Sequence, residues 1–387
     1  MTRTTTPIDP VAFEKMRRIA PNLAAARREG DAADWRARAL PEEIAFKLTN
    51  RCDLRCAHCY QWSADGYHRH LAAEDRRGDL DLAHVARMLE ATRPVRSNVF
   101  LWGGEPLIYR DWDGLVDLLV ADPRWTSVCT NGTLIERRLA SLARLGRHLE
   151  VSVSLDGFAA EHDALRGTGS FERSWRGVQL LLDEERAGRF KGQATVNCVI
   201  SDALVPRLFE FVAFLDGAGI DTVYVSLPWY LAPAGAARMD DYFTRHFGWT
   251  LPPEPPSWHS YTFRLNPAGI DALAAQTARI DAAPWRIKVR FNPRIEGEDL
   301  RPFVQGSDRP AQGKTRCQST RARMDVFPNG DVVSCKFFPE FRVGNLHEAD
   351  FAAIWQGERF DQVRSTVAEC GLMPACAKCN LLYTRGT

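Results

Sequence analysis

The sequence predicts an α/β fold, a partial (β/α)6 barrel of the TIM type followed by a small cysteine-rich C-terminal domain. Six short runs rich in Val, Ile, Thr and aromatic residues alternate with helical patterns, which favours a parallel sheet with right-handed crossovers. Six β-then-α units are fewer than the eight of a closed barrel, so we expect an open one with its chemistry at the carboxyl ends of the strands.

The expected strands are residues 42–50, 95–103, 124–132, 149–157, 193–201 and 221–229. A helical pattern follows each of the first five, and Asp79 is the expected cap of the first of these helices. An earlier helix is expected over residues 10–28. Residues 230–312 are less regular, with a proline-rich connector at 252–258, a helix at 267–281 and a strand at 287–295. Near the end, Asn329-Gly330 predicts a hairpin turn.

These patterns divide the chain into four expected segments. They are an N-terminal helical extension (1–41), the barrel (42–230), a connecting region (231–312) and the cysteine-rich domain (313–387). The net charge of +1 gives no electrostatic case for nucleic acid or an anionic membrane. Neither a signal-peptide core nor a membrane-length apolar run is evident in the sequence, so we expect a cytoplasmic protein.

Ten cysteines in such a sequence suggest metal or redox chemistry rather than disulfides. Cys52, Cys56 and Cys59 form a CxxxCxxC motif just after the first expected strand. Three thiolates on one loop can hold three irons of a cubane and leave the fourth iron open to a small molecule. By spacing alone, a zinc knuckle or buried structural cysteines remain alternatives.

Three further features, at the ends of the second and fourth expected strands and in the segment after the fourth, carry polar groups suited to one ligand. Gly103-Gly104-Glu105 offers acceptors for an ammonium group, although an ordinary turn has the same composition. Ser154 and Asp156 suit ribose hydroxyls, or act as a cap pair. Arg166 can clamp a carboxylate, or form a surface ion pair.

Together these features resemble the radical SAM superfamily over residues 42–229. The resemblance implies an enzyme that reductively cleaves S-adenosylmethionine (SAM) to a 5′-deoxyadenosyl radical, which abstracts hydrogen from a substrate C–H bond. It also implies a set of contacts to SAM: the methionine amino group by Gly103, Gly104 and Glu105, ribose by Ser154 and Asp156, the methionine carboxylate by Arg166, and adenine by His58 and Leu227. His58 stands where the superfamily motif has an aromatic residue before the third cysteine.

A second group of cysteines lies near the end of the sequence and consists of Cys317, Cys335, Cys376 and Cys379. Four thiolates fit a zinc site or a complete cubane equally well. Gly330-x4-Cys335 followed by CxxC resembles the twitch form of the SPASM domain, which implies one auxiliary [4Fe–4S] cluster that accepts an electron from the substrate radical. Cys370 is left as a substitute ligand or as buried filler.

Cys198, in the fifth expected strand, is a tentative catalytic residue that returns a hydrogen atom to the substrate, provided that it faces the barrel interior. The alternative is a small buried hydrophobe, which is also our expectation for Cys129. Trp229, after the sixth strand, lies where substrate is expected, with a packing role as the alternative.

The resemblance favours a maturase that modifies a side chain of a ribosomally made peptide or protein. A natural-product enzyme that dehydrogenates or epimerises an amino sugar or nucleoside is the alternative. An alternative of another class is a non-catalytic zinc or iron–sulfur protein. The family implies flavodoxin or ferredoxin as reductant. The ~40 residues before the barrel are short for a leader-binding domain, so a separate protein is expected to supply that function.

Overall fold

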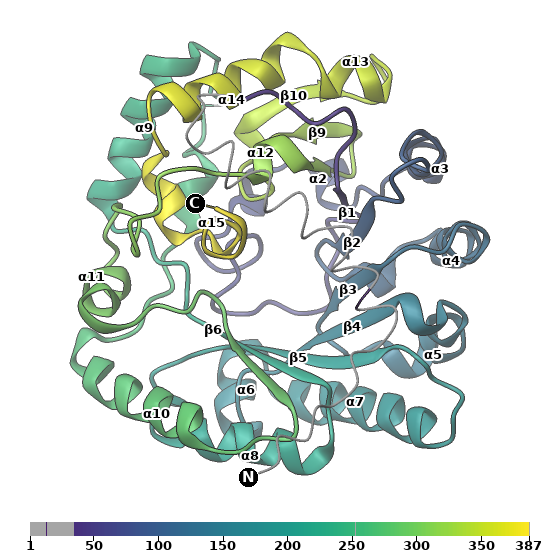
Figure 1. Cartoon of the computed structure of the whole chain (residues 1–387), viewed down its shortest axis with the longest axis vertical. Helices are drawn as coiled ribbons and strands as arrows, with labels where there is room; N and C mark the ends of the chain where they lie inside the picture. Colours follow the sequence, from purple (N-terminus) through teal and green to yellow (C-terminus); the bar gives the residue numbers. More distant parts are fainter. Residues whose placement is uncertain (1–12, 14–34, 252, 387) are drawn as a thin grey trace.

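A computed structural model describes residue 13, residues 35–251 and residues 253–386. Its centre is one open sheet with the strand order β10-β9-β8-β1-β2-β3-β4-β5-β6-β7. Figure 1 shows this sheet curving through the middle of the molecule. The expected helix at 10–28 lies outside the described residues.

Six parallel strands form the barrel, and each lies within a run that the sequence predicts. They are β1 (Glu43–Lys47), β2 (Asn98–Trp102), β3 (Thr126–Thr130), β4 (Leu149–Ser154), β5 (Gln193–Val199) and β6 (Thr222–Ser226). The strands are shorter than the predicted runs, because the polar residues at the run ends form the loops that carry the site. The prediction of an open partial barrel is confirmed.

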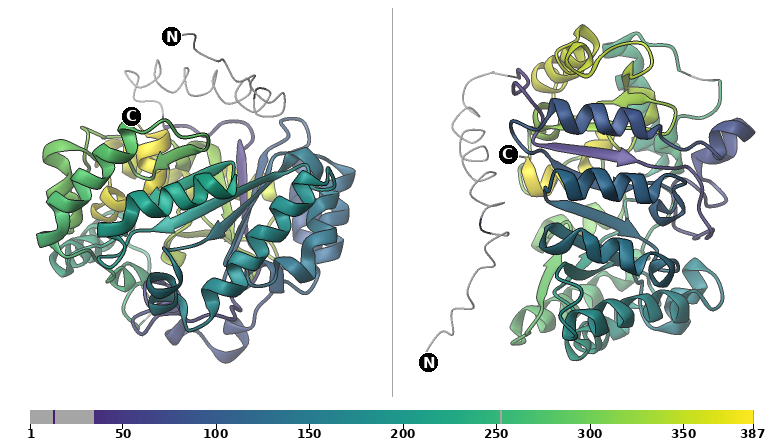
Figure 2. Two further views of the ribbon diagram at one scale, coloured as in Figure 1. Left: turned by 90° about the horizontal axis from the view of Figure 1, so that it is seen from below. Right: turned by 90° about the vertical axis from the view of Figure 1, so that its right-hand side faces the viewer.

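Helices connect the strands and lie around the outside of the sheet (Figures 1 and 2). They are α3 (Leu82–Ala91), α4 (Trp112–Ala121), α5 (Ile135–Arg144), α6 (Ala159–Arg166), α7 (Ser170–Arg186) and α8 (Leu208–Ala218), with a short α2 (Ala73–Arg76) before them. The cap of α3 differs from the prediction. Asp81, not Asp79, accepts a hydrogen bond from the N–H of Ala83 at 2.8 Å. The Asp79 carboxylate instead pairs with Arg51.

The two faces of the sheet differ in polarity, because successive side chains of a strand point to opposite sides. Val151 of β4 and Val196 of β5 pack into the apolar core that also contains residues of the surrounding helices. On the opposite, inner face, the Tyr224 hydroxyl donates to Glu150 at 3.1 Å and the Ser226 hydroxyl donates to Asn197 at 2.9 Å. The inner face is therefore the one suited to hold polar ligands.

The C-terminal segment extends the barrel sheet. β8 (Arg323–Val326) pairs with β1 in parallel, and β9 (Asp331–Val333) and β10 (Arg342–Asn345) follow antiparallel. The predicted turn is confirmed, with Gly330 at φ 81° in the left-handed region that glycine tolerates. At the other edge, β7 (Lys288–Phe291) pairs with β6, inside the predicted run at 287–295. The sheet thus runs across the expected boundary at residue 312, and the division into four segments stays a prediction.

The remaining helices surround this extension. They are α9 (Pro233–Phe247), α10 (Ile270–Ala282), α11 (Leu300–Val304), α12 (Ser319–Ala322), α13 (Phe351–Trp355), α14 (Glu358–Glu369) and α15 (Asn380–Arg385). Helix α10 confirms the prediction at 267–281. Helix α9 was not predicted, although Pro233 at its first turn and buried Met239, Phe243 and Phe247 at helical spacing mark it. Among the described residues, no helix has the length and apolarity to cross a membrane.

Candidate active site

The CxxxCxxC loop follows β1 and is held in place by backbone hydrogen bonds. The N–H of Ala57 donates to the carbonyl of Leu165 at 2.7 Å, which joins the loop to the end of α6. The N–H of Leu54 lies 3.4 Å from Cys52 Sγ, and the N–H of Trp62 lies 3.3 Å from Cys59 Sγ. Backbone donors aimed at sulfur stabilise thiolates, which are the forms that bind iron.

The protein environment of these thiols favours occupation by a positively charged group. Burial raises the pKa of the Cys56 thiol to about 11; Arg166 opposes this rise and the neighbouring Cys59 adds to it. The pKa of Cys52 is also raised, chiefly by burial. Three clustered thiolates are therefore costly on their own, and a metal cluster offsets that cost. The donor set fits a cubane with one iron free of protein ligands.

The turn Gly103-Gly104-Glu105-Pro106, here called the GGEP turn, follows β2 and packs against the backbone that leads into the cysteine loop. A Cβ on Gly104 would lie 2.2 Å from the carbonyl oxygen of Arg51, so only glycine fits there. The N–H groups of Gly104 and Glu105 donate to the carbonyls of Thr49 and Arg51 at 2.8 and 2.7 Å. The glycines thus allow the turn to approach the neighbouring backbone closely. This packing fixes the turn beside the cysteine loop.

The Glu105 side chain is hydrogen-bonded within the protein. Its carboxylate is fully buried and accepts hydrogen bonds from the Thr130 hydroxyl at 2.7 Å and the N–H groups of Asn131 and Leu107 at 2.7 and 3.0 Å. Burial raises the pKa of Glu105 to about 7. The side chain thus joins the ends of β2 and β3, and its contact with an ammonium group stays a prediction.

Arg166, Asp156 and His58 form one buried group beside Cys56. Arg166 donates through Nε to Asp156 at 2.6 Å, and another of its nitrogens lies 3.8 Å from Cys56 Sγ. The position of Arg166 next to the cysteine loop fits its predicted contact with a carboxylate. His58 Nε2 lies 3.4 Å from Asp156, and burial lowers the pKa of His58 to about 4, so its ring is neutral.

The Asp156 carboxylate is hydrogen-bonded within the protein. It is fully buried, and its second carboxylate oxygen accepts the N–H of Val199 at 2.9 Å. Burial raises its pKa, but Arg166 and His58 lower it further, so that the net shift is downward. Asp156 thus positions Arg166, and its contact with ribose stays a prediction. Ser154, at the end of β4, makes no side-chain hydrogen bond to a described residue, so its predicted ribose contact stays open.

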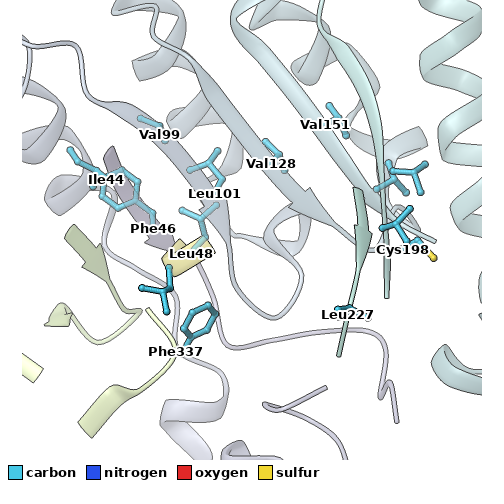
Figure 3. Close-up of a cluster of buried hydrophobic side chains, with 14 of the residues drawn as sticks. Ile44, Phe46, Leu48, Val99, Leu101, Val128, Val151, Cys198, Leu227 and Phe337 are labelled. Atoms are coloured by element: carbon cyan, nitrogen blue, oxygen red, sulfur yellow. The ribbon is translucent and has the colours of Figure 1, made fainter. Parts of the chain in front are cut away.

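Cys198 does not face the barrel interior. It lies fully buried in the helix-facing apolar core, part of which is drawn in Figure 3 with Cys198 labelled. The tentative hydrogen-donor role is therefore wrong, because the strand pleat directs the side chain away from the inner face. Cys129 of β3 packs instead with Trp102 of β2 and Phe327, a residue that follows β8, in a small cluster on the inner face. Leu227 belongs to the apolar core, and its predicted adenine contact stays untested.

The four C-terminal cysteines meet at one cavity. Cys317, Cys335, Cys376 and Cys379 all line it, whereas Cys370 is exposed at the end of α14 and is not among the lining residues. Burial raises the pKa of Cys335 and Cys376 well above the usual value for a thiol. The unpartnered hydroxyl of buried Ser334 also borders the cavity, where it can donate to a cluster sulfur. This cavity fits a cubane held by four thiolates.

Within the described ranges, no three His, Cys, Asp or Glu side chains converge closely enough to hold a single metal ion. The ligands of a cubane bind separate iron atoms at its corners, so they stand further apart than those of one ion.

Sequence reasoning missed the residues that tie the cysteine loop to β3. The Asp53 carboxylate accepts hydrogen bonds from the Asn131 amide and the Thr133 hydroxyl, both at 2.7 Å. Gln61, just beyond the loop, donates to the carbonyl of Gly103 at 3.3 Å. The Thr-Asn-Gly segment at the end of β3 was the available signal, because strand ends of one parallel sheet meet at one edge.

Two family models match the segments of the chain that contain the two cysteine groups. The model of the radical SAM superfamily matches residues 46–186, and that of the SPASM iron–sulfur cluster-binding domain matches residues 317–380. The mycofactocin maturase MftC of Mycolicibacterium smegmatis is 27% identical over 349 residues, covering 86% of this chain and 76% of the relative. The pre-heme d1 synthase of Dinoroseobacter shibae is 31% identical over 340 residues, covering 83% and 75%.

Solved structures share the fold. Streptococcus suis SuiB bound to its precursor peptide SuiA matches with a TM-score of 0.59 and 18% identity, covering 99% of this chain and 78% of that one. The anSMEcpe structure with bound AdoMet matches with a TM-score of 0.54 and 15% identity, covering 83% and 82%. The chain therefore belongs to the radical SAM superfamily, as an enzyme that uses SAM with a [4Fe–4S] cluster and carries a C-terminal SPASM domain for auxiliary iron–sulfur binding.

Proposed function

We propose that this enzyme matures a ribosomally made peptide or protein by abstracting hydrogen from a C–H bond of one of its side chains, with an auxiliary [4Fe–4S] cluster as electron acceptor. The observation that carries the proposal is the convergence of Cys317, Cys335, Cys376 and Cys379 on one cavity that Arg323 and Asp325 of β8 also line. Because β8 pairs with β1, and the CxxxCxxC loop follows β1, both cysteine groups adjoin one continuous sheet.

The bound SAM and its reduced cluster supply a 5′-deoxyadenosyl radical, and the protein supplies position and exclusion of water. In this proposal Cys52, Cys56 and Cys59 hold the SAM cluster. Arg166, fixed by Asp156, binds the methionine carboxylate, and Ser154 contacts ribose. The backbone of Gly103 and Gly104 binds the amino group. The buried, neutral His58 packs against adenine.

The names of the relatives support two substrate classes. A peptide substrate is supported by similarity to mycofactocin maturases over most of both sequences. A tetrapyrrole is the second candidate, favoured by the 31% identity to a pre-heme d1 synthase and by similarity to AdoMet-dependent heme synthases. We propose flavodoxin or ferredoxin as the electron donor in either case.

Anaerobic reconstitution with dithionite and SAM tests the proposal. Wild-type protein is expected to hold about eight irons, which equals two cubanes, and to release 5′-deoxyadenosine. Cys56→Ala should abolish 5′-deoxyadenosine. Cys376→Ala should lower the iron content and stop product formation but still cleave SAM. The exposed Cys370→Ala is the matched control and should behave as wild type.

Candidate substrates are a peptide encoded beside the gene and a porphyrin that carries propionate groups. A mass change in the peptide supports peptide maturation. A mass change in the porphyrin alone would contradict peptide maturation and support the tetrapyrrole as substrate. Full iron content and product formation in Cys376→Ala would contradict the auxiliary site.

A further inference from the structure

Charged side chains gather on the inner face of the sheet where β8 meets β1, and most of them neutralise each other. Arg323 donates two hydrogen bonds to Asp325, both at 2.8 Å, and also pairs with Glu43 of β1. Arg385 of α15 forms a second ion pair with Glu43. Both carboxylates of this group are therefore committed to the two arginines.

Lys336 is a nearby cation that takes part in none of these ion pairs. It borders the cavity of the four cysteines, together with Arg323 and Asp325. Its ammonium makes no hydrogen bond or ion pair with any residue in the described ranges. Its neighbours are instead aromatic faces: Nζ lies 4.6 Å from the ring centroid of Phe337, 5.3 Å from Phe100 and 5.7 Å from Trp229. Cation–π contacts hold an ammonium in place but leave its N–H donors unused.

The aromatic wall around Lys336 reaches from one cysteine group to the other. Trp229 contacts Phe337 with ring centroids 4.2 Å apart and Tyr60 with centroids 6.3 Å apart. Tyr60 directly follows Cys59, and Lys336 directly follows Cys335. A molecule that lies against this wall is thus placed between the predicted SAM cluster and the auxiliary cluster, where a substrate must be held.

We propose that Lys336 binds a carboxylate of the substrate, with the Trp229–Phe337 wall packing against the apolar part of the same molecule. This inference rests on the proposed function, because it assigns a substrate contact within the same site. Among the described residues no carboxylate pairs with the Lys336 ammonium, so a single negative charge on the substrate matches it. A phosphate dianion would keep an uncompensated charge there, and the nearest arginine is already paired. Peptide carboxylates and porphyrin propionates share this chemistry.

Comparing the acid and neutral forms of a probe measures the contribution of the contact between Lys336 and a carboxylate. Binding of N-acetylphenylalanine and its amide, and of mesoporphyrin IX and its dimethyl ester, is measured by anaerobic calorimetry on the holoenzyme with SAM. At least one acid should bind about tenfold or more tightly than its neutral partner, as expected for a charge-assisted hydrogen bond. The pair that shows this preference identifies the source of the carboxylate.

Variants assign the preference to Lys336. Lys336→Met keeps the length of the side chain and should remove the preference, while Lys336→Arg should keep most of it. Lys191→Met, an exposed lysine, is the matched control and should bind as wild type. Iron content and the release of 5′-deoxyadenosine show that each variant is folded and loaded.

Two outcomes overturn the inference. The first is equal binding of acid and neutral forms by wild-type enzyme. The second is a Lys336→Met variant that keeps the preference but shifts the reduction potential of the auxiliary cluster, because Lys336 then serves only to offset cluster charge. If wild-type enzyme instead fails to release 5′-deoxyadenosine, the proposed function fails, whatever the binding preference.

Discussion

Glu105 and Asp156 both lie at strand ends around the site, and both use their carboxylates inside the protein. Glu105 accepts three hydrogen bonds and Asp156 accepts bonds from Arg166 and Val199. Buried carboxylates need such partners, since an unpaired one costs several kcal/mol, about 3–5 when a buried ion pair is broken. These hydrogen bonds give both carboxylates a positioning role, beside the contacts with SAM that stay predictions.

Cys198→Ala should leave catalysis intact, because the side chain lies in the apolar core. We expect normal release of 5′-deoxyadenosine and normal product, with a loss of about 1 kcal/mol in the free energy of unfolding from the small cavity. Chemical denaturation and a turnover assay measure the two effects. A variant that folds and cleaves SAM but forms no product would restore the hydrogen-donor role of Cys198.

At the scale of elements, the loops that carry the site are held to each other rather than built independently. The GGEP turn presses on the backbone before the cysteine loop, and Asn131 after β3 bonds Asp53 inside that loop. The geometry of the iron site therefore depends on three neighbouring strand ends at once. Such support from residues beyond the ligands is general for metal sites.

Gly104→Ala should disrupt this packing. The new Cβ would lie 2.2 Å from a backbone oxygen that cannot move freely, which we expect to cost about 1–3 kcal/mol and to reduce cluster content and SAM cleavage. Gly217→Ala in α8 is the matched control, since nothing lies within 4 Å of its Cβ. It should keep full activity and gain about 0.5–1 kcal/mol in unfolding free energy. Wild-type iron content and activity in Gly104→Ala would contradict the close packing of the turn.

For the whole molecule, the pairing of β8 with β1 joins the C-terminal segment to the barrel. Figure 1 shows the green and yellow C-terminal elements beside β1, and Arg323 links the two strands through Asp325 and Glu43. The auxiliary site and the SAM site consequently adjoin one sheet, so we expect a disturbance at this junction to affect both.

Arg323→Met should destabilise the entire protein. It leaves Asp325 and Glu43 buried with less compensation, which we expect to cost about 3 kcal/mol or more of the unfolding free energy. The exposed pair of Arg301 with Asp271 provides the control, and Arg301→Met should cost less than about 1 kcal/mol. Denaturant unfolding of both variants measures the difference. Equal stability of the two would show that the junction contributes little.

The predictable features of this fold are those that depend on contacts between residues close together in the sequence. Strand and turn positions depend on neighbouring residues, so the six barrel strands and the Asn329-Gly330 turn could be predicted. Helix α9 was not predicted, although the helical spacing of its apolar residues is visible in the sequence. The cap at Asp81 in place of Asp79 is an error of boundary, which local patterns resolve least well.

The sequence by itself determined the parallel barrel, the two cysteine groups and the family, because residue spacing and strand alternation are local properties of the polypeptide. Only the tertiary structure decided that Cys198 faces the helices, that Glu105 and Asp156 are hydrogen-bonded within the protein, and that no carboxylate pairs with Lys336 among the described residues. These facts depend on which distant residues meet, and a side chain in a buried site is assigned its role by the groups that pack against it.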